Sequence, residues 1–282
     1  MMDISEYLLL LVPPSTAHKV KDNVYITSLA TARPSRLAER QASRRLRGSR
    51  PFSGSVHNLT NGTVQGGSVI SADRHDEYSE NWAGVIIESP PSGQNFSTVT
   101  GTIVVPTPSG TNGSGSAWVG IDGDTASQSI LQAGIDFTVQ GGKVSYDSWY
   151  EWYPNYAYDF TNFAISAGNT ITITVHSTSA TAGIVTLSNQ STGKSVSQSL
   201  TAPSSSSALK GQNAEWIVED YEEGGNLVAF ANFGTVTFSG ANASTSSKTL
   251  GPNSGIKVNI EQNGKVLTST SDTSNSVTVK HT

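Results

Sequence analysis

The sequence predicts an all-β body, folded either as a two-sheet sandwich or as a barrel. Charged residues make up only 14% of the 282 residues, while Ser, Thr, Gly and Asn are abundant, and this composition favours short strands over helices. From Tyr78 onward, short alternating stretches are separated by Gly, Pro, Ser and Asn. No long stretch keeps the period of a helix. Length alone allows one large all-β domain or two ordinary domains, and the uniform pattern after Tyr78 favours one domain over residues 78–282.

Residues 1–77 are predicted to form a poorly ordered, basic leader. Residues 1–76 hold ten Lys and Arg against six Asp and Glu, and residues 77–282 hold seven Lys, no Arg and sixteen Asp and Glu, so +4 and −9 give the net charge of −5. The stretch 32–54 is rich in Arg, Ser and Pro with few large apolar side chains. A nucleic-acid-binding arm is the other common interpretation of such a stretch. The acidic body lacks the clustered cations that phosphate contacts need, and it is the nearest anionic partner of the leader.

The sequence is consistent with a secreted protein and contains no membrane span. No segment approaches the roughly eighteen apolar residues that cross a bilayer. The run Leu8–Val12 is too short for a signal peptide and follows Asp3 and Glu6, so either the chain starts elsewhere or export uses another signal. Secretion would suit the six Asn-x-Ser/Thr sites, which begin at Asn58, Asn61, Asn95, Asn112, Asn189 and Asn242.

Several stretches of the body are predicted to be half-buried strands because apolar residues occupy every second position. The first is 98–105, with Val99, Gly101, Ile103 and Val105 on one face, and the second is 171–175, with Ile171, Ile173 and Val175 on one face. Three more are indicated by Val236 and Phe238, by Ile256, Val258 and Ile260, and by Val277 and Val279.

Between the first two of these strands, Ser129–Phe137 has one apolar face and one mixed face. Leu131, Ala133, Ile135 and Phe137 form the apolar face, so Gln132 points to the other side. An ordinary solvated strand face explains this pattern, and a functional polar face is the alternative.

Ser145–Tyr158 carries two Trp and five Tyr. Alternation places Asp147, Trp149, Glu151 and Tyr153 on one face, and Ser148, Tyr150 and Trp152 on the other. A cleft that holds an extended polymer uses aromatic contact area and orienting carboxylates. A core aromatic cluster with peripheral acids explains the same residues.

In Asn213–Asp220, Glu215, Ile217 and Glu219 share one face, and Trp216, Val218 and Asp220 share the other. Asp220, Glu222 and Glu223 are predicted to form a solvated acidic turn that leads to Gly224 and Gly225.

Several catalytic classes are excluded by the residues present. The chain has no Cys, and the body has only His176 and His281, so thiol nucleophiles, zinc sites and a Ser-His-Asp triad find no support. Pepsin-like Asp-Thr-Gly or Asp-Ser-Gly loops are replaced by Asp124-Thr-Ala and Asp272-Thr-Ser. Carboxylates and amides remain, and no cofactor or metal is expected.

The body resembles the glutamic peptidases, also called eqolisins, throughout residues 78 to about 282. The matching stretches are Tyr78-Ser-Glu-Asn-Trp-Ala-Gly84, Ala117-Trp-Val-Gly-Ile-Asp-Gly-Asp124, Ile130-Leu-Gln-Ala-Gly-Ile-Asp-Phe137, Asp147-Ser-Trp-Tyr-Glu-Trp-Tyr-Pro154, Asn213-Ala-Glu-Trp-Ile-Val-Glu-Asp220 and Leu227-Val-Ala-Phe-Ala-Asn-Phe-Gly234. The resemblance implies a sandwich of two antiparallel sheets, of concanavalin-like or jelly-roll type, with substrate across a concave face. It also implies a secreted, monomeric acid endopeptidase that cleaves polypeptides, is insensitive to pepstatin and is inhibited by its own basic propeptide.

The resemblance further implies which residues act. Gln132 and Glu215 would be the catalytic pair. The residues implied to line or support the cleft are Trp118, Asp122, Asp136, Asp147, Trp149, Glu151 and Tyr153. A carboxylate with a reference pKa near 4.3 keeps an ionised fraction in acid, where a His base would be protonated. The Gln132 amide does not titrate and stays a hydrogen-bond donor at any working pH.

The chain departs from the family in one feature. Fungal members commonly carry cysteines near the catalytic glutamine, which this chain lacks, but the catalytic pair does not depend on sulfur.

Two other functions stay open. A non-enzymatic carbohydrate-binding sandwich would use the Trp149–Tyr158 aromatics, and a glycosidase would use two carboxylates such as Glu151 and Glu215.

Overall fold

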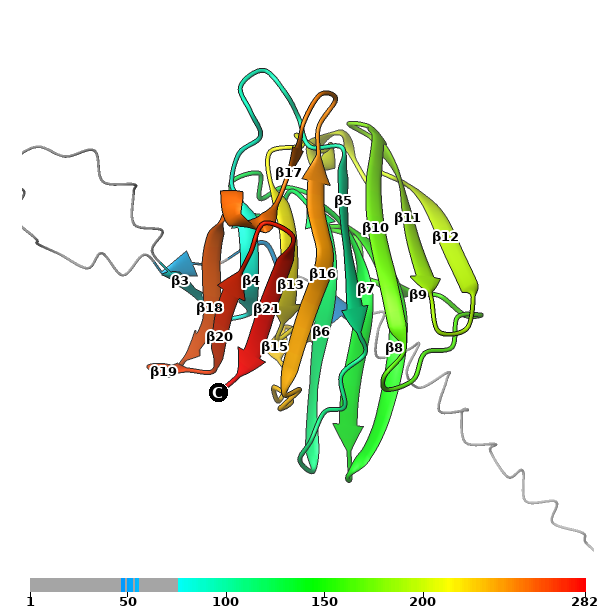
Figure 1. Cartoon of the computed structure of the whole chain (residues 1–282), viewed down its shortest axis with the longest axis vertical. Coiled ribbons are helices and arrows are strands. Elements are labelled where there is room, and N and C mark those ends of the chain that lie inside the picture. Colours follow the sequence, from blue (N-terminus) through cyan, green and yellow to red (C-terminus); the bar gives the residue numbers. More distant parts are fainter. Residues whose placement is uncertain (1–46, 49, 53, 56–75) are drawn as a thin grey trace, which may run out of the picture. The chain divides into compact units, whose positions relative to one another are not determined.

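The computed structural model of the chain describes residues 47–48, 50–52, 54–55 and 76–282. Most of the leader predicted for residues 1–77 lies outside these described residues. Within them, the chain forms strands and two short 3-10 turns, Ser205–Ser207 and Pro252–Ser254. The predicted all-β class is confirmed (Figure 1).

The first of the two large sheets carries the segments that resemble the family's catalytic stretches. Its strands, in spatial order, are β2 (Gly54–Ser55), β3 (Asp76–Ser79), β18 (Ile256–Gln262), β4 (Trp82–Ile87), β13 (Ala214–Glu219), β6 (Asn112–Ile121), β7 (Ile130–Gln140), β8 (Lys143–Tyr153) and β9 (Tyr158–Asp159), and β19 (Lys265–Val266) pairs with β18. The pairing is antiparallel except between β18 and β3, which run parallel. Strand β3 begins at Asp76, which is two residues before Tyr78, the predicted start of the domain.

The second large sheet covers one face of the first. Its order is β12 (Lys194–Thr201), β11 (Ala182–Asn189), β10 (Thr170–Ser179), β5 (Thr98–Val104), β16 (Thr235–Ser244), β21 (Ser276–His281) and β20 (Thr268–Asp272), and β17 (Thr249–Leu250) pairs with β16. A small third sheet holds β1 (Arg47–Gly48), β14 (Glu222–Glu223) and β15 (Asn226–Leu227). The sandwich of two antiparallel sheets is thus confirmed.

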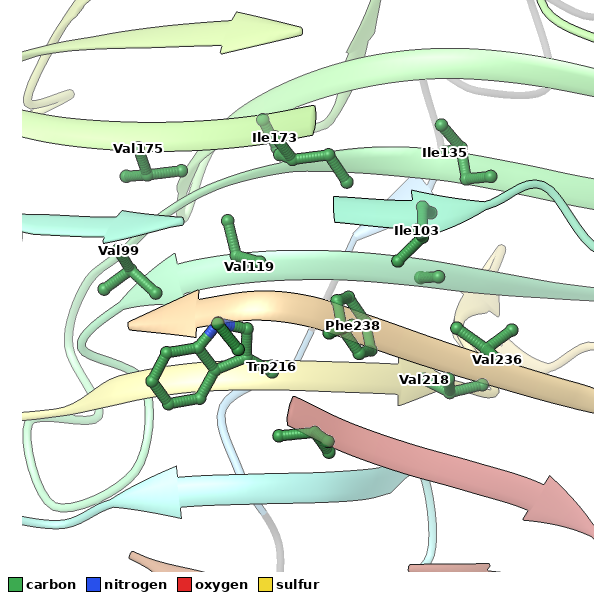
Figure 2. Packing of buried hydrophobic residues seen from close by; sticks show 14 of the residues in the cluster. Val99, Ile103, Val119, Ile135, Ile173, Val175, Trp216, Val218, Val236 and Phe238 are labelled. Atoms are coloured by element: carbon green, nitrogen blue, oxygen red, sulfur yellow. The ribbon is translucent and has the colours of Figure 1, made fainter. Parts of the chain in front are cut away.

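The core lies between the two large sheets. Figure 2 shows side chains of both sheets meeting there, among them Val99, Ile103 and Ile173 of the second sheet and Val119, Ile135 and Trp216 of the first. Every second residue of β5 is buried, as the alternation predicts. Strand β18 departs from strict alternation, because Val258, Asn259 and Ile260 are all buried and both faces of its centre are covered.

The opposite face of the first sheet carries a second apolar cluster that includes Trp82, Trp118, Ile130, Trp149 and Ile217. The predicted faces of three strands are confirmed by this division. Leu131, Trp152 and Trp216 belong to the core between the sheets, whereas Trp149 and Ile217 belong to the second cluster. Gln132 and Glu215 lie on the face of this second cluster, away from the core.

Candidate functional site

Three neighbouring strands bring the predicted catalytic residues into one row. Glu215 on β13 pairs with Gly120 on β6, Gly120 pairs with Gln132 on β7, and Gln132 pairs with Glu151 on β8. Because neighbouring strands lie about 4.8 Å apart, the backbones of Glu215 and Gln132 are separated by roughly 10 Å. Gly120 has no side chain to fill this gap. The two functional groups can therefore face a molecule that lies over Gly120.

Glu215 and Gln132 are buried without hydrogen-bond partners. Both side chains are 0% exposed, and neither the two carboxyl oxygens of Glu215 nor the Nε2 and Oε1 atoms of Gln132 has a partner among the described residues. Buried polar groups are nearly always hydrogen-bonded, so each such exception calls for an explanation. Four such atoms in one row are what a site needs if its hydrogen bonds are to be made to a water and a substrate. The alternative of a solvated strand face for Gln132 is wrong, because the side chain is not exposed.

The pKa of the Glu215 carboxyl is raised well above its ordinary value. Burial is the largest cause, and the nearby carboxylates Asp122 and Asp124 raise it further. The neutral form of Glu215 is therefore favoured in this structure.

Asp122 supports the site rather than opening into it. It adopts a positive φ of 65°, and its Oδ2 accepts hydrogen bonds from the backbone N–H groups of Lys210 (2.6 Å) and Gly211 (3.0 Å). Its Oδ1 accepts two more, from Gln212 (2.6 Å) and Asn213 (3.2 Å). These bonds tie the end of β6 to the segment that leads into β13 and so to Glu215. Burial raises the pKa of Asp122, and the four backbone bonds oppose that rise.

The two tryptophans predicted for the cleft lie in the next row. Trp118 pairs with Gly134, and Gly134 pairs with Trp149. A Cβ on Gly134 would lie 2.6 Å from the Cβ of Trp118, so only glycine fits between these two strands. Trp118 Nε1 donates to Glu219 Oε2 (2.8 Å), and Trp149 Nε1 donates to Ser116 Oγ (3.2 Å). Both indoles are fully buried and fixed in orientation.

The remaining predicted residues occupy the same face, within the catalytic row and on both sides of it. Asp136 and Asp147 pair with each other one row beyond the tryptophans, and Asp136 is 1% exposed. Tyr153 lies on the other side of the catalytic row, opposite Ile130, and packs against the second cluster. Glu151 is buried beside Gln132. Eight of the nine predicted side chains thus share one face, with Asp122 as their support.

Three residues of importance to the site were not singled out from the sequence. Asn213 donates to Glu88 O (2.9 Å) and Thr125 Oγ1 (2.7 Å) and accepts from two backbone N–H groups of the 124–126 loop. Glu219 orients Trp118. Asp220, expected in a solvated turn, is 1% exposed and accepts from Gln262 Nε2 (2.8 Å), so that expectation is wrong. The sequence signal for Asn213 was its presence in the same matching stretch as Glu215, and for Glu219 it was that stretch together with the alternation that places it on the face of Glu215.

The geometry bears on the two other functions considered. Glu151 and Glu215 are three strands apart, roughly 14 Å between backbones, whereas paired glycosidase carboxyls lie about 5 to 9.5 Å apart. Trp149 and Trp152 are buried and offer no exposed ring to a sugar, although Tyr156 and Tyr158 are about half exposed.

Within the described part of the chain, no three His, Asp or Glu side chains are grouped to hold a metal ion. The same part contains no helix that is long and apolar enough to span a membrane.

Comparisons with known proteins show the family to which the chain belongs. Residues 80–281 match the model of the peptidase A4 family. The chain is 43% identical to aspergillopepsin-2 of Aspergillus niger over 233 residues, covering 75% of the chain and 81% of that protein. It is 46% identical to scytalidopepsin B of Scytalidium lignicola over 144 residues, covering 51% of the chain and 52% of that protein.

Solved structures give the same result. A crystal structure of scytalido-glutamic peptidase with a transition state analog inhibitor superposes with a TM-score of 0.66 at 36% identity, covering 72% of this chain and 98% of that one. The aspergilloglutamic peptidase from Aspergillus niger superposes with a TM-score of 0.58 at 50% identity, covering 60% of this chain and 99% of that one. The chain therefore belongs to the peptidase A4 family, the glutamic peptidases or eqolisins, and is a peptidase.

Proposed function

We propose that the chain is an acid endopeptidase in which Glu215 activates water and Gln132 stabilises the oxyanion. The observation that supports this assignment is the row Glu215–Gly120–Gln132, in which a carboxyl and an amide are buried, unpartnered among the described residues and separated by a glycine. Because the chain belongs to a peptidase family, its expected substrates are polypeptides.

The proposed reaction uses only these two side chains. Ionised Glu215 takes a proton from a water that the Gln132 carbonyl helps to hold, and the oxygen attacks the peptide carbonyl carbon. The Gln132 N–H donates to the oxygen that becomes negative. Protonated Glu215 then gives its proton to the amide nitrogen as the C–N bond breaks. Loss of one preorganised donor costs on the order of 3 kcal/mol, or about 10² to 10³ in kcat.

The raised pKa of Glu215 has a consequence for this cycle. The neutral acid, favoured here by burial, is the form that donates to the leaving amine, whereas the first step needs the carboxylate. Since desolvation is the largest cause of the rise, water entering the site lowers the pKa and makes the base available. Access of water and substrate to this face is thus part of the proposed activation.

The test is proteolysis of a denatured protein between about pH 2 and 5, the range in which a glutamate near its reference pKa titrates. Parent, Glu215→Gln and Glu80→Gln are compared in the presence of pepstatin, with exposed Glu80 as the control for the same chemical change. Activity in the parent and in Glu80→Gln, with none in Glu215→Gln, is the expected result. Inhibition by pepstatin or full activity of Glu215→Gln would overturn the assignment.

We further propose that the leader inhibits the body and is released in acid, as in a secreted, monomeric zymogen. Arg50 Nε lies 2.8 Å from Glu222 Oε1. The Phe52 N–H donates to Gly123 O (2.9 Å), and the Phe52 ring lies 5.9 Å from that of Trp82 in the second cluster. Gly123 stands between Asp122 and Asp124, the two carboxylates that act on Glu215. These contacts of Arg50 and Phe52 support the proposal that the leader inhibits the body from a position next to Glu215.

Electrostatics gives this regulation a direction. Acidification protonates carboxylates in general, so the attraction of the acidic body for the basic leader weakens. Full-length Arg50→Gln is expected to gain activity at about pH 5, by about two- to fivefold because exposed ion pairs are weak. Lys194→Gln, on the second sheet, serves as the charge control. Inhibition that persists unchanged when the whole Arg33–Arg50 cluster is neutralised would contradict the electrostatic account.

A further inference from the structure

A cavity of about 480 Å³ lies on the same face as the candidate catalytic row, at the far end of the strands. Asn112, Ser114, Thr138, Gln140, Ser145 and Asp147 line it from β6, β7 and β8. Tyr221, Glu223 and Val228 close it from the segment around the β14–β15 hairpin. The mechanism proposed above uses none of these residues.

Strand register places this cavity relative to Gln132. Ser114 pairs with Thr138, and Thr138 pairs with Ser145, in a row parallel to the Gly120–Gln132–Glu151 row. Thr138 is six residues from Gln132 on β7, which is roughly 20 Å of extended strand. A polypeptide in extended conformation would need about six residues to reach from one row to the other.

The lining is polar and carries negative charge. Asp147 and Glu223 contribute carboxyl groups, and the hydroxyls of Ser114 and Thr138 are 3.0 Å apart. The described residues that line the cavity include no Lys or Arg. Glu222, next to Glu223, is the acidic partner of Arg50. The charge of the cavity therefore suits a cationic side chain.

Strand β1 of the chain itself lies beside a strand that lines this cavity. Strand β1 pairs antiparallel with β14, with Arg47 opposite Glu223 and Gly48 opposite Glu222. Five residues after Arg47, the Phe52 N–H binds Gly123 O beside Asp122 and Asp124. Arg47 and Gly48 thus lie at the hairpin that closes the cavity, and Phe52 lies at the loop that acts electrostatically on Glu215. Addition of a strand to an exposed edge is a common way for proteins to hold peptides.

We propose that this cavity is a distal subsite for a Lys or Arg side chain of an extended polypeptide substrate, which binds β14 as an added strand. The orientation of β1 places the cationic residue on the N-terminal side of the scissile bond, five or six residues away. The proposal rests on the proposed peptidase function and adds a substrate preference to it.

The experiment compares two peptides that share one cleavable sequence and carry either Lys or Gln six residues before the scissile bond. The full chain is first converted in acid, and kcat and KM are then measured at about pH 5, where exposed carboxylates are mostly ionised. The parent is expected to show a KM about three- to fivefold lower for the Lys peptide, with similar kcat, because a remote contact acts equally in ground and transition states. The double variant Glu222→Gln/Glu223→Gln is expected to bring the KM ratio close to one.

Two controls separate the possible failures. Glu80→Gln/Glu261→Gln removes the same charge away from the cavity and is expected to keep the parent's ratio. Binding of the same peptides is also measured by fluorescence polarisation to Glu215→Gln that a trace of parent has converted. An equal KM for both peptides in the parent, together with equal binding, would overturn the subsite. A binding preference without turnover of either peptide by the parent would overturn the proposed catalysis and leave the subsite standing.

Discussion

Gly120 is the residue on which the geometry of the pair depends most directly. It stands between Glu215 and Gln132 in the strand register, and a Cβ at this position would lie 2.9 Å from a ring carbon of Trp118 and 3.3 Å from Glu215 Oε2. The first distance is shorter than real side chains tolerate, and the ring it would meet is buried. A side chain at position 120 would therefore have to displace the Trp118 ring and crowd the Glu215 carboxyl.

Gly120→Ala is expected to reduce kcat at least tenfold while destabilising the protein by about 1 to 3 kcal/mol, the usual cost of overpacking. The added methyl group displaces the Glu215 carboxyl and occupies the place of the water. Peptide hydrolysis in acid and urea unfolding measure the two effects separately.

Gly101→Ala is the matched control for this substitution. Gly101 lies on β5, and its Cβ would meet the Trp216 ring at 3.1 Å in the core between the sheets, so crowding is similar but remote from the pair. It is expected to lose stability with kcat retained. If both variants lost activity in proportion to stability, Gly120 would have only a packing role.

At the scale of elements, strand β13 is positioned from outside itself. The Asp122 carboxylate accepts four backbone N–H groups of residues 210–213, and the Asn213 side chain in turn holds the 124–126 loop. The two segments thus bind each other reciprocally immediately before Glu215. This connection fixes the backbone from which β13 begins and therefore the position of Glu215.

Asp122→Asn is expected to destabilise the protein by about 2 to 4 kcal/mol and to lower kcat. Asn keeps one oxygen but turns an NH2 group toward backbone donors, so two of the four bonds are lost, and bonds to charged groups are the stronger ones. Urea unfolding and acid proteolysis give the two values. Asp76→Asn, which loses a partly exposed ion pair with Lys257, is the control and is expected to cost under about 1 kcal/mol. A cost for Asp122→Asn as small as that of the control would contradict the supporting role.

For the whole molecule, the sequence predicted what depends on local alternation. The all-β class and the faces of β7, β8 and β13 follow from a period of two, which each strand carries by itself. That alternation had already turned Gln132 and Glu215 toward one face, and the resemblance to the glutamic peptidases singled them out. It could not predict that they would be buried, because burial depends on what packs over that face.

Long-range contacts explain the other differences. The partners of Asp122 lie 88 to 91 residues away, and its positive φ leaves no mark in a Gly-rich segment. Asp220 looked like part of an acidic turn because its neighbours Glu222 and Glu223 are charged, yet Gln262 from a distant strand covers it. The parallel pairing of β3 with β18 is equally nonlocal.

The carboxyl groups of Asp124 and Asp220 predict how the stability of the protein depends on pH. Burial, followed by repulsion from Glu88, raises the pKa of Asp124 to about 6. Burial also raises the pKa of Asp220 to about 7, with a hydrogen bond from Gln262 opposing the rise and Glu219 adding to it. In the unfolded chain both titrate near 3.9. Between these values the folded protein binds more protons than the unfolded one, so stability is full below about pH 4 and falls as pH rises toward 7. A protein that works in acid loses nothing by this arrangement.

Asp220→Asn isolates one of these groups. The amide keeps an acceptor for Gln262 and cannot ionise, so the free energy of unfolding is expected to change little at pH 4 and to fall less steeply up to pH 7. The difference in slope approaches about 1.4 kcal/mol per pH unit, the value for one proton. Urea unfolding at four pH values between 4 and 7 measures it, with exposed Glu80→Gln as a control that should retain the parent's slope. Equal slopes in all three proteins would mean that Asp220 ionises as readily in the fold as in the unfolded chain, and that burial on this sheet does not favour the acidic form.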